Sequence, residues 1–166
     1  WIYVAIAIGM EKPEKDLLSQ KPRDPKQGIL TKEFSALMLL QGALIAVVVM
    51  TAFYIGLQVN AATASTMAFA TLGLIQLLHA FNVKSVYQSV FKVGLFRNKT
   101  FNWAIPVAFV LLMATIVVPG FNNLFHVSHL SLTQWLAVIV GSFLIVVLVE
   151  LVKAIQRALG KDKDAI

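Results

Sequence analysis

Three polar side chains recur along one apolar stretch of this chain, at a spacing that could serve chemistry. Gln76, His79 and Asn82 stand at positions i, i+3 and i+6 within "LIQLLHAFN", which places successive members on neighbouring parts of a helix surface. Amide oxygens and imidazole nitrogens can coordinate a cation, yet uncharged polar groups in apolar helices also hydrogen-bond neighbouring helices. The pattern favours the second role for this trio and leaves ion binding as the alternative.

Two other pairs have spacings that suggest a site. His126 and His129 form an H-x-x-H pair, but residues 119–131 contain no Cys, Asp or Glu that could complete a metal site. Because zinc needs three or four ligands, we expect both histidines to be solvated. Glu150 is the sole acid in the interior of an apolar span, and Lys153 follows three residues later. That spacing predicts an ion pair on one helix surface rather than an ion ligand.

The composition explains why such groups are scarce. The chain of 166 residues is 58% hydrophobic and 13% charged, whereas soluble domains carry roughly 25% charged residues. No Asp, Glu, Lys or Arg occurs from Phe34 to Val83, a run longer than the roughly 20 residues that cross a bilayer once. The absence of cysteine excludes disulfides and thiolate metal sites. These features together predict a membrane protein.

Apolar length predicts four transmembrane helices. They cover residues 33–57, 64–83, 102–118 and 134–156. Backbone groups in lipid must pair within their own segment, so helices are expected throughout. Ser131 and Gln134 have the S-x-x-Q spacing of a capping box, which predicts where the fourth helix begins. The predicted fold class is all-α, a polytopic transmembrane helix bundle with four full spans plus the end of a preceding one.

Charge patterning predicts the orientation of the spans. All 14 Lys and Arg residues lie before the first full span, between the second and third, or near the end of the chain, and the loops 58–63 and 119–133 contain none. By the positive-inside rule, the basic loops and the C-terminus of a multi-pass protein in the cell membrane are cytoplasmic. The net charge of +6 is therefore attributed to orientation and to contact with the lipid bilayer, with no nucleic acid as partner.

The same reading divides the chain into four parts. Residues 1–9 are apolar but too short to span a bilayer by themselves, so we expect them to be the end of a transmembrane helix. We expect residues 10–32 to be a cytoplasmic loop. Residues 33–157 form a four-helix transmembrane region, and residues 158–166 are a cytoplasmic tail.

Two short motifs have a structural and a functional interpretation. Asn98-Lys99-Thr100 matches the glycosylation sequon, but it lies in a loop predicted to be cytoplasmic, so we expect it to be unmodified. Gly42 and Ala46 give the first full span a small-xxx-small face, which is either a docking face for another helix or an ordinary occurrence of glycine in a membrane span.

Three separated segments resemble P-type cation-transporting ATPases of the calcium-pump branch. "AIGMEKPEKDLLSQKPRDP" (7–25) is similar to the loop after the sixth transmembrane helix of that family. "AFNVKSVYQSVFKVGLFRNKTFNWA" (80–104) is similar to the loop between the eighth and ninth helices, and "LSLTQWLAVIVGSFLIVVLVELVK" (130–153) to the tenth helix. The resemblance extends over the whole chain, as helices seven to ten with the end of helix six.

This resemblance implies the C-terminal membrane-domain portion of an ATP-driven P-type cation transporter, which supports the ion-carrying helices. For the parent pump it implies ATP, Mg²⁺ and a transported cation, which is Ca²⁺ in the most similar branch. It implies as partners the remaining helices and the cytoplasmic domains of the ATPase. The family's Asp-Lys-Thr-Gly-Thr phosphorylation motif and nucleotide domain do not occur in these residues, so we expect no catalytic or cofactor-binding residue here and no catalysis by this chain alone.

The resemblance also places one metal-site residue. Two-ion calcium pumps supply a Glu from helix eight, and Gln76 stands at that position, where a neutral amide still offers one oxygen to a hard cation. Similarity to one-ion members suggests a single ion per cycle. On helix six, Trp1 and Val4 stand where the family has a ligand Asp and a Pro, so either these first residues are atypical or that ligand has been lost.

A second interpretation comes from another class of protein, a free-standing non-catalytic four-helix membrane protein or accessory subunit. The first residue is Trp rather than Met, which suggests a fragment or a processed chain. A reading frame that continues upstream into the phosphorylation motif would support the pump, and a nearby start codon would support the free-standing protein.

Overall fold

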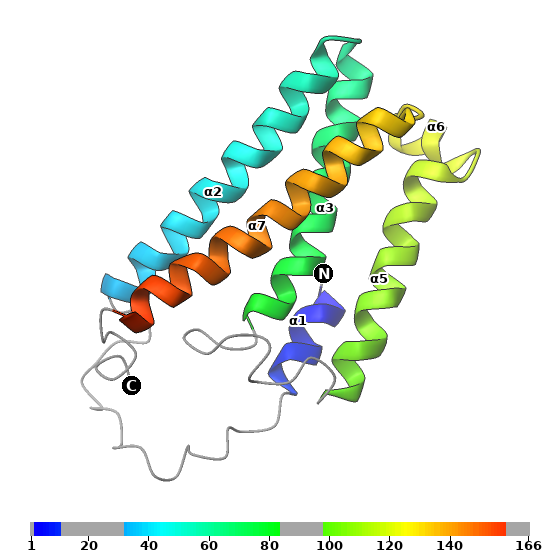
Figure 1. Ribbon diagram of the computed structural model, residues 1–166. Coiled ribbons are helices and arrows are strands. Elements are labelled where there is room, and N and C mark those ends of the chain that lie inside the picture. The colour runs from blue at the N-terminus through cyan, green and yellow to red at the C-terminus, as the bar shows by residue number, and fades with distance from the viewer. Residues whose placement is uncertain (1, 11–31, 84–97, 159–166) are drawn as a thin grey trace.

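The computed structural model describes residues 2–10, 32–83 and 98–158. Within these ranges all regular structure is helical, and no strand occurs. The helices are α1 (Ile2–Gly9), α2 (Lys32–Leu57), α3 (Ala61–Val83), α5 (Lys99–Val117), α6 (Phe121–Phe125) and α7 (Leu132–Ala158) (Figure 1). The predictions made for Trp1, for most of the loop at 10–32, for the basic loop at 84–97 and for the tail fall outside the described residues.

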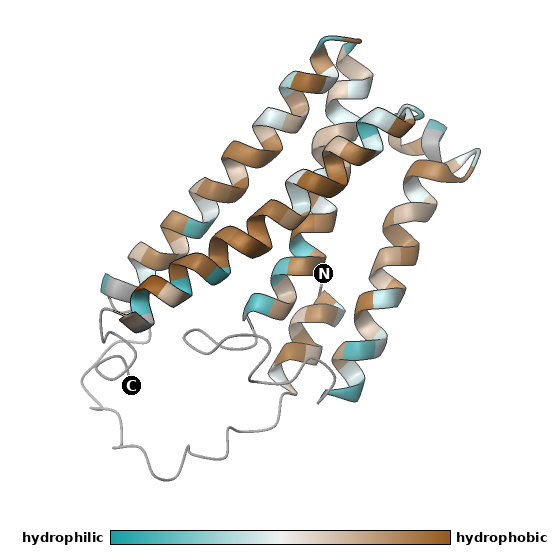
Figure 2. Ribbon diagram, in the orientation of Figure 1, coloured by the Kyte–Doolittle hydropathy of each residue, from teal (hydrophilic) through white to brown (hydrophobic). Residues whose placement is uncertain are grey.

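Four of the helices are long and apolar enough to cross a membrane. These segments are Phe34–Leu57, Ala61–Asn82, Lys99–Val117 and Leu132–Gln156. Brown, hydrophobic residues extend along all four helices in Figure 2, and many large apolar side chains face outward from the described bundle. The predicted all-α transmembrane bundle is therefore confirmed.

Polar caps begin three of these helices earlier than the apolar pattern predicted. Asn60 accepts a hydrogen bond from the Thr63 backbone N–H at 2.7 Å, so α3 begins at Ala61 rather than at residue 64. Asn98 accepts one from the Phe101 N–H at 3.0 Å, so α5 begins at Lys99 rather than at residue 102. Each cap pairs a backbone donor that the first turn of a helix would otherwise leave without a partner.

The predicted capping box before α7 is confirmed. The Ser131 backbone N–H donates to Gln134 Oε1 at 2.7 Å, and the Gln134 backbone N–H donates to Ser131 Oγ at 3.4 Å. Because this reciprocal pair closes the first turn, α7 starts at Leu132, two residues before the start expected from hydropathy.

Helix α3 lies at the centre of the bundle and packs against α2 and α7 (Figure 1). A short turn at 58–60 joins α2 to α3, and the two helices approach closely at their connected ends. A Cβ atom on Gly56 would lie 2.6 Å from the Ala64 Cα, so this contact requires glycine. Helix α5 contacts α3 and α1 and diverges from α7 (Figure 1).

Three clusters of buried apolar side chains hold the helices together. Met67, Ala70, Ile116 and Val138 meet in one cluster with Ala52, which joins α3 to α2, α5 and α7. A second cluster joins α3 to α7 through Ile75, Ile145 and Val149. A third joins α1, α3 and α5 through Val4, Ala7, Ala80 and Phe101, and the Phe101 ring meets that of Phe81 edge-on, with centroids 4.9 Å apart.

The charged ends of the helices gather at one end of the bundle. Helices α2 and α5 begin there, and α3 and α7 end there (Figure 1). Of the three described lysines, Lys32 and Lys99 are the first residues of α2 and α5, and Lys153 lies five residues before the end of α7. We call this the basic end of the bundle.

Candidate functional site on helix α3

Gln76 lies in the middle of α3, half-buried in a groove between α3 and α5. The groove has a volume of about 350 Å³. Its lining residues are Phe69, Leu72, Gly73, Gln76, Ala108, Leu111, Leu112 and Thr115. The two helices are close here, because a Cβ atom on Gly73 would lie 2.7 Å from Leu112 Cδ1.

The groove offers few polar atoms. Thr115 Oγ1 already donates to the Leu112 carbonyl oxygen at 2.7 Å, so its lone pairs remain as acceptors together with the Gln76 amide. Calcium binds six to eight oxygens in proteins. The Gln76 groove can therefore contribute oxygen atoms to an ion site, but its own residues cannot complete one.

His79 and Asn82 continue along α3 toward the basic end. Asn82 is 2% exposed, and its side-chain amide has no hydrogen-bond partner within the described part of the chain. His79 Nδ1 is likewise buried and has no partner among the described residues. Buried polar atoms of this kind are normally paired with protein or with ordered water.

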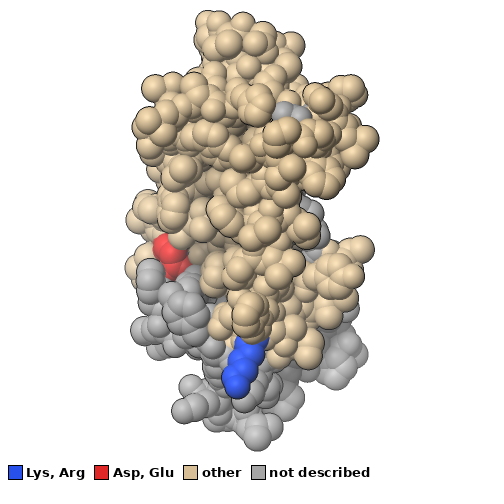
Figure 3. All heavy atoms as spheres, turned by 90° about the vertical axis from the view of Figure 1, so that its right-hand side faces the viewer, with Lys and Arg blue, Asp and Glu red and all other residues tan. Residues whose placement is uncertain are grey.

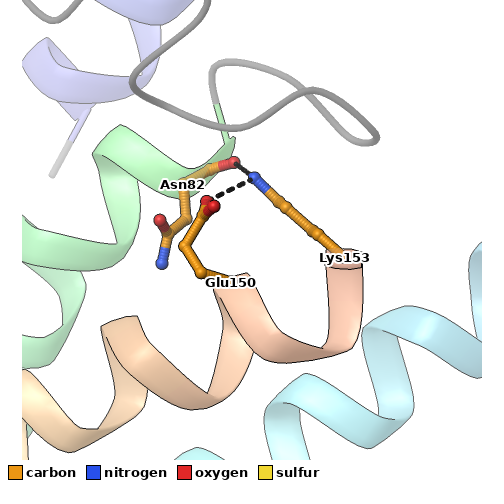
Figure 4. A network of polar contacts seen from close by, with 3 residues as sticks. All are labelled: Asn82, Glu150 and Lys153. Atoms are coloured by element: carbon orange, nitrogen blue, oxygen red, sulfur yellow. Dashed lines mark hydrogen bonds and ion pairs between the residues drawn. The ribbon is translucent and has the colours of Figure 1, made fainter. Parts of the chain in front are cut away.

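Lys153 of α7 reaches across to the carboxyl end of α3 (Figure 4). Its Nζ donates to the Asn82 backbone oxygen at 2.7 Å and lies 3.5 Å from Glu150 Oε1. The predicted ion pair is thus confirmed, with side chains that are 2% and 19% exposed for Lys153 and Glu150. Lys153 pairs one of the late carbonyl groups that a helix leaves open, so it fastens α3 to α7 at the basic end.

Asn98 joins α1 to α5 at the same end of the bundle. Besides capping α5 through Oδ1, its Nδ2 donates to the Ala7 carbonyl oxygen in the last turn of α1 at 2.7 Å. The residue is 7% exposed, so both functional atoms of its amide are engaged and buried. Glycosylation needs a free, accessible amide nitrogen, which gives a geometric reason to expect that this sequon is unmodified.

Comparison with known proteins decides the family. Residues 2–155 match the family described as "Cation transporting ATPase, C-terminus". The chain belongs to this family. It is 35% identical to a calcium-transporting ATPase of Listeria monocytogenes over 158 residues, which cover 95% of the chain and 18% of that protein. It is 36% identical to a calcium-transporting ATPase of Bacillus subtilis over 138 residues, which cover 81% of the chain and 15% of that protein.

The similarity extends to animal proteins. Calcium-transporting ATPase type 2C member 1 of Homo sapiens is 26% identical over 159 residues, covering 95% of the chain and 17% of that protein. The chain therefore spans less than a fifth of the length of the relatives it matches. It is a membrane-located, C-terminal cation-ATPase region, and its described residues include four helices long and apolar enough to span a membrane.

Within this cation-ATPase region, the structure separates the residues that the sequence grouped together. Gln76 faces the groove toward α5, whereas the Asn82 backbone is bonded to α7. Six residues of a helix fall about 120° short of two full turns, so the i, i+3, i+6 series winds from one neighbouring helix toward another. The three side chains do not converge on one site.

Other candidates form no site in the described ranges. No group of three or more His, Cys, Asp or Glu there could hold a metal ion. His126 and His129 are both exposed, as the sequence predicted, and His126 has a φ of 53° in the turn after α6. Gly42 and Ala46 face outward from α2, and an added Cβ on Gly42 would meet nothing within 4 Å. The close-packing prediction for that face remains untested.

The sequence did not predict two hydrogen bonds that link helices, from Asn98 to Ala7 and from Lys153 to Asn82. A signal for Asn98 was present, because Asn directly before an apolar helix is a preferred N-cap. The partners of both residues are backbone carbonyl groups 91 and 71 positions away. No side-chain pattern marks such an acceptor.

Proposed function

We propose that this chain is the membrane-domain C-terminal portion of an ATP-driven, calcium-transporting P-type ATPase, in which it supports the ion-carrying helices. The observation that carries the proposal is the match of 95% of the chain to the Listeria calcium-transporting ATPase at 35% identity. The parent pump would use ATP and Mg²⁺ to move Ca²⁺, and the rest of that protein would supply the phosphorylation and nucleotide sites.

The support role rests on how the helices are fastened. Helix α3 packs between α2 and α7 and is bonded to α7 through Lys153, and α1 is bonded to α5 through Asn98. Together with the apolar clusters that join α3 to α5, these bonds hold the α3–α5 groove in place, so that Gln76 can present an amide oxygen to an ion held mainly by other helices. A site of this kind needs further oxygens from the parent pump.

The orientation belongs to the same proposal. The basic end of the bundle faces the cytoplasm, with the predicted loops at 10–32 and 84–101 and the tail at 158–166 as cytoplasmic parts, because Lys and Arg favour that side. The domain division at 1–9, 10–32, 33–157 and 158–166 is proposed on this basis.

ATP-dependent uptake of radioactive calcium into membrane vesicles tests the proposal. The full-length protein that contains this chain should accumulate calcium, and a version truncated before Lys32 should not. A full-length protein that hydrolyses ATP without moving calcium would contradict the assigned ion. Uptake that survives truncation would contradict the support role.

A further inference from the structure

Asn82 and Glu150 bring polar atoms without hydrogen-bond partners to the junction of α3 and α7. Asn82 is 2% exposed, and neither its Nδ2 nor its Oδ1 has a partner in the part of the chain that the structure describes. Glu150 Oε1 lies 3.5 Å from Lys153 Nζ as an ion pair, but it too lacks a hydrogen-bond partner among these residues. Together with His79 and Lys153, these two residues form what we call the α3–α7 polar cluster.

One ammonium group shows how small this cluster is. Lys153 Nζ is 2.7 Å from the Asn82 backbone oxygen and 3.5 Å from Glu150 Oε1, so Asn82 and Glu150 lie within reach of a single small molecule. Figure 4 shows the Asn82 side chain and the Glu150 carboxyl group on the same side of this ammonium. His79, whose buried Nδ1 is also unpartnered within the described ranges, precedes Asn82 by three residues and neighbours it on the α3 surface.

The cluster lies at the charged end of the molecule and yet is closed to bulk water at Asn82. On the side shown in Figure 3, described Lys, Arg, Asp and Glu residues appear only in the lower half, toward the end of the bundle at which α3 and α7 end. A buried amide that pairs with nothing costs free energy, because it has given up its hydrogen bonds to water. A bound molecule that pairs with these atoms removes that cost.

The charges of the cluster decide what kind of molecule fits. The Lys153 ammonium already occupies the place of a cation beside Glu150, and the Glu150 carboxylate repels an anion. The ligand is therefore neutral and small. It must also accept from an amide N–H and donate to a carboxylate oxygen, and water does both. Water further serves either orientation of the Asn82 amide group, whose oxygen and nitrogen can exchange places.

Thr71 provides a contrast on the same helix. It is 0% exposed, and its Oγ1 has no hydrogen-bond partner among the described residues. Ser142 Oγ lies 3.5 Å from the Thr71 backbone oxygen, but this hydroxyl already donates to the Val138 oxygen at 2.7 Å. A buried water needs roughly two to four polar partners, and a lone hydroxyl cannot supply them. We therefore expect the junction to be dry at Thr71.

From the burial of Asn82, the unpartnered atoms on two facing helices and the balance of charge, we propose that the α3–α7 polar cluster binds an ordered water molecule. This water accepts from the Asn82 amide and donates to Glu150 Oε1 and to His79 Nδ1. It joins the side chains of α3 and α7 beside the bond that Lys153 makes to the α3 backbone. The water site does not depend on the proposed transport function.

The sign of a stability change tests this site in the full-length protein. Asn82→Leu removes the amide at nearly constant size and keeps the backbone oxygen that Lys153 binds. Loss of an amide that holds water should lower the melting temperature in detergent, whereas loss of an amide that pairs with nothing should leave it unchanged or raise it. Thr71→Val is the matched control and should not lower it. An Asn82→Leu protein that melts at or above the wild-type temperature would overturn the proposal.

Radiolytic hydroxyl-radical labelling, read by mass spectrometry, separates a bound water from a mere packing effect of leucine. X-rays split a bound water in place, so side chains beside it are oxidised. His79 should be labelled in the wild type and several-fold less in Asn82→Leu. Met67 is 0% exposed in an apolar cluster, and although methionine is oxidised readily, it should stay unlabelled in both. Equal labelling of His79 in the two proteins would contradict a water at Asn82.

An experimental structure of the wild-type full-length protein, at a resolution that shows waters, needs no variant. Density for one water should lie within hydrogen-bond distance of the Asn82 amide and of Glu150. A direct bond between these two side chains, or a side chain from elsewhere in the protein in that place, would overturn the water site.

Discussion

The side-chain ammonium of Lys153 on α7 donates a 2.7 Å hydrogen bond to the backbone carbonyl oxygen of Asn82 in the last turn of α3. A carbonyl in that turn has no partner within its own helix, and Lys153 is only 2% exposed. One bond therefore closes the end of α3 and fixes the position of α7 against it. Glu150, 3.5 Å away, balances the charge that this arrangement buries (Figure 4).

Replacing Lys153 should loosen the basic end of the bundle. Lys153→Met keeps the length of the side chain but removes a charged hydrogen bond, so we expect the free energy of unfolding to fall by about 2 kcal/mol. Glu150→Gln keeps the bond to Asn82 but leaves the buried Lys153 ammonium without its counter-charge, so we expect it to lower the free energy of unfolding as well, by more than a solvent-exposed i, i+3 pair contributes. Unfolding of the purified protein in mixed detergent micelles measures both. A Lys153→Met protein as stable as wild type would show that the bond to Asn82 contributes little.

Asn98 allows the two roles of one amide to be separated. Asn98→Ala loses the cap of α5, worth about 1 kcal/mol, and the bond to the Ala7 oxygen, worth about 1 kcal/mol more. Asn98→Asp keeps an oxygen that can cap α5 but loses the donor to Ala7. We therefore expect the stability of Asn98→Asp to lie between those of wild type and Asn98→Ala. An Asn98→Asp protein as stable as wild type would show that the hydrogen bond from Asn98 to Ala7 does not stabilise the contact between α1 and α5.

The number and type of helices follow from the sequence because lipid imposes one strong requirement. Each spanning backbone must pair its own polar groups, so long apolar runs identified all four spans. Their starts were misplaced where a polar residue caps the helix, since Asn60 and Asn98 look like loop residues by hydropathy alone. Hydropathy reports transfer into lipid, whereas a cap is set by backbone geometry.

The candidate site was less predictable than the fold. Local spacing was enough for the Glu150–Lys153 pair, whose members are three residues apart on one helix. Spacing could not show that Gln76 faces α5 while Asn82 is fastened to α7, because those partners depend on how three helices pack. The Gln76 groove could not be predicted either, since it is formed by side chains from helices that are distant in sequence.

The orientation can be measured by labelling single cysteines in intact cells. The chain has no native cysteine, so each new thiol in it has a known position. Asn60 is exposed between α2 and α3 and Asn123 is exposed in α6, both away from the basic end, and cysteines placed there should react with a membrane-impermeant maleimide. Cysteines at Lys32 and Lys99 should react only after the membrane is opened. Labelling of the Lys99 position from outside would reverse the proposed topology.

Gln76 gives the sharpest test of an ion-pathway role within the proposed pump. If its amide oxygen contacts the ion, Gln76→Ala in the full-length protein should weaken the apparent calcium affinity of the ATPase without lowering expression. Gln76→Glu should change that affinity in the opposite direction or add a second site, because a charged oxygen interacts strongly with a divalent cation at low dielectric. If Gln76 only joins helices, Ala should cost about 0.6 kcal/mol of stability and leave ion affinity unchanged.

The matched control for these variants is Gln58, an exposed amide in the turn before α3 that lies outside the Gln76 groove. Gln58→Ala should leave both the calcium dependence and the stability unchanged. Calcium-dependent ATP hydrolysis is measured across a calcium titration for all four proteins in the same membranes, with expression quantified in parallel. Coincident titration curves for Gln, Ala and Glu at position 76 would exclude this residue from the ion pathway, because a ligand amide, a methyl group and a carboxylate cannot bind a divalent cation equally well.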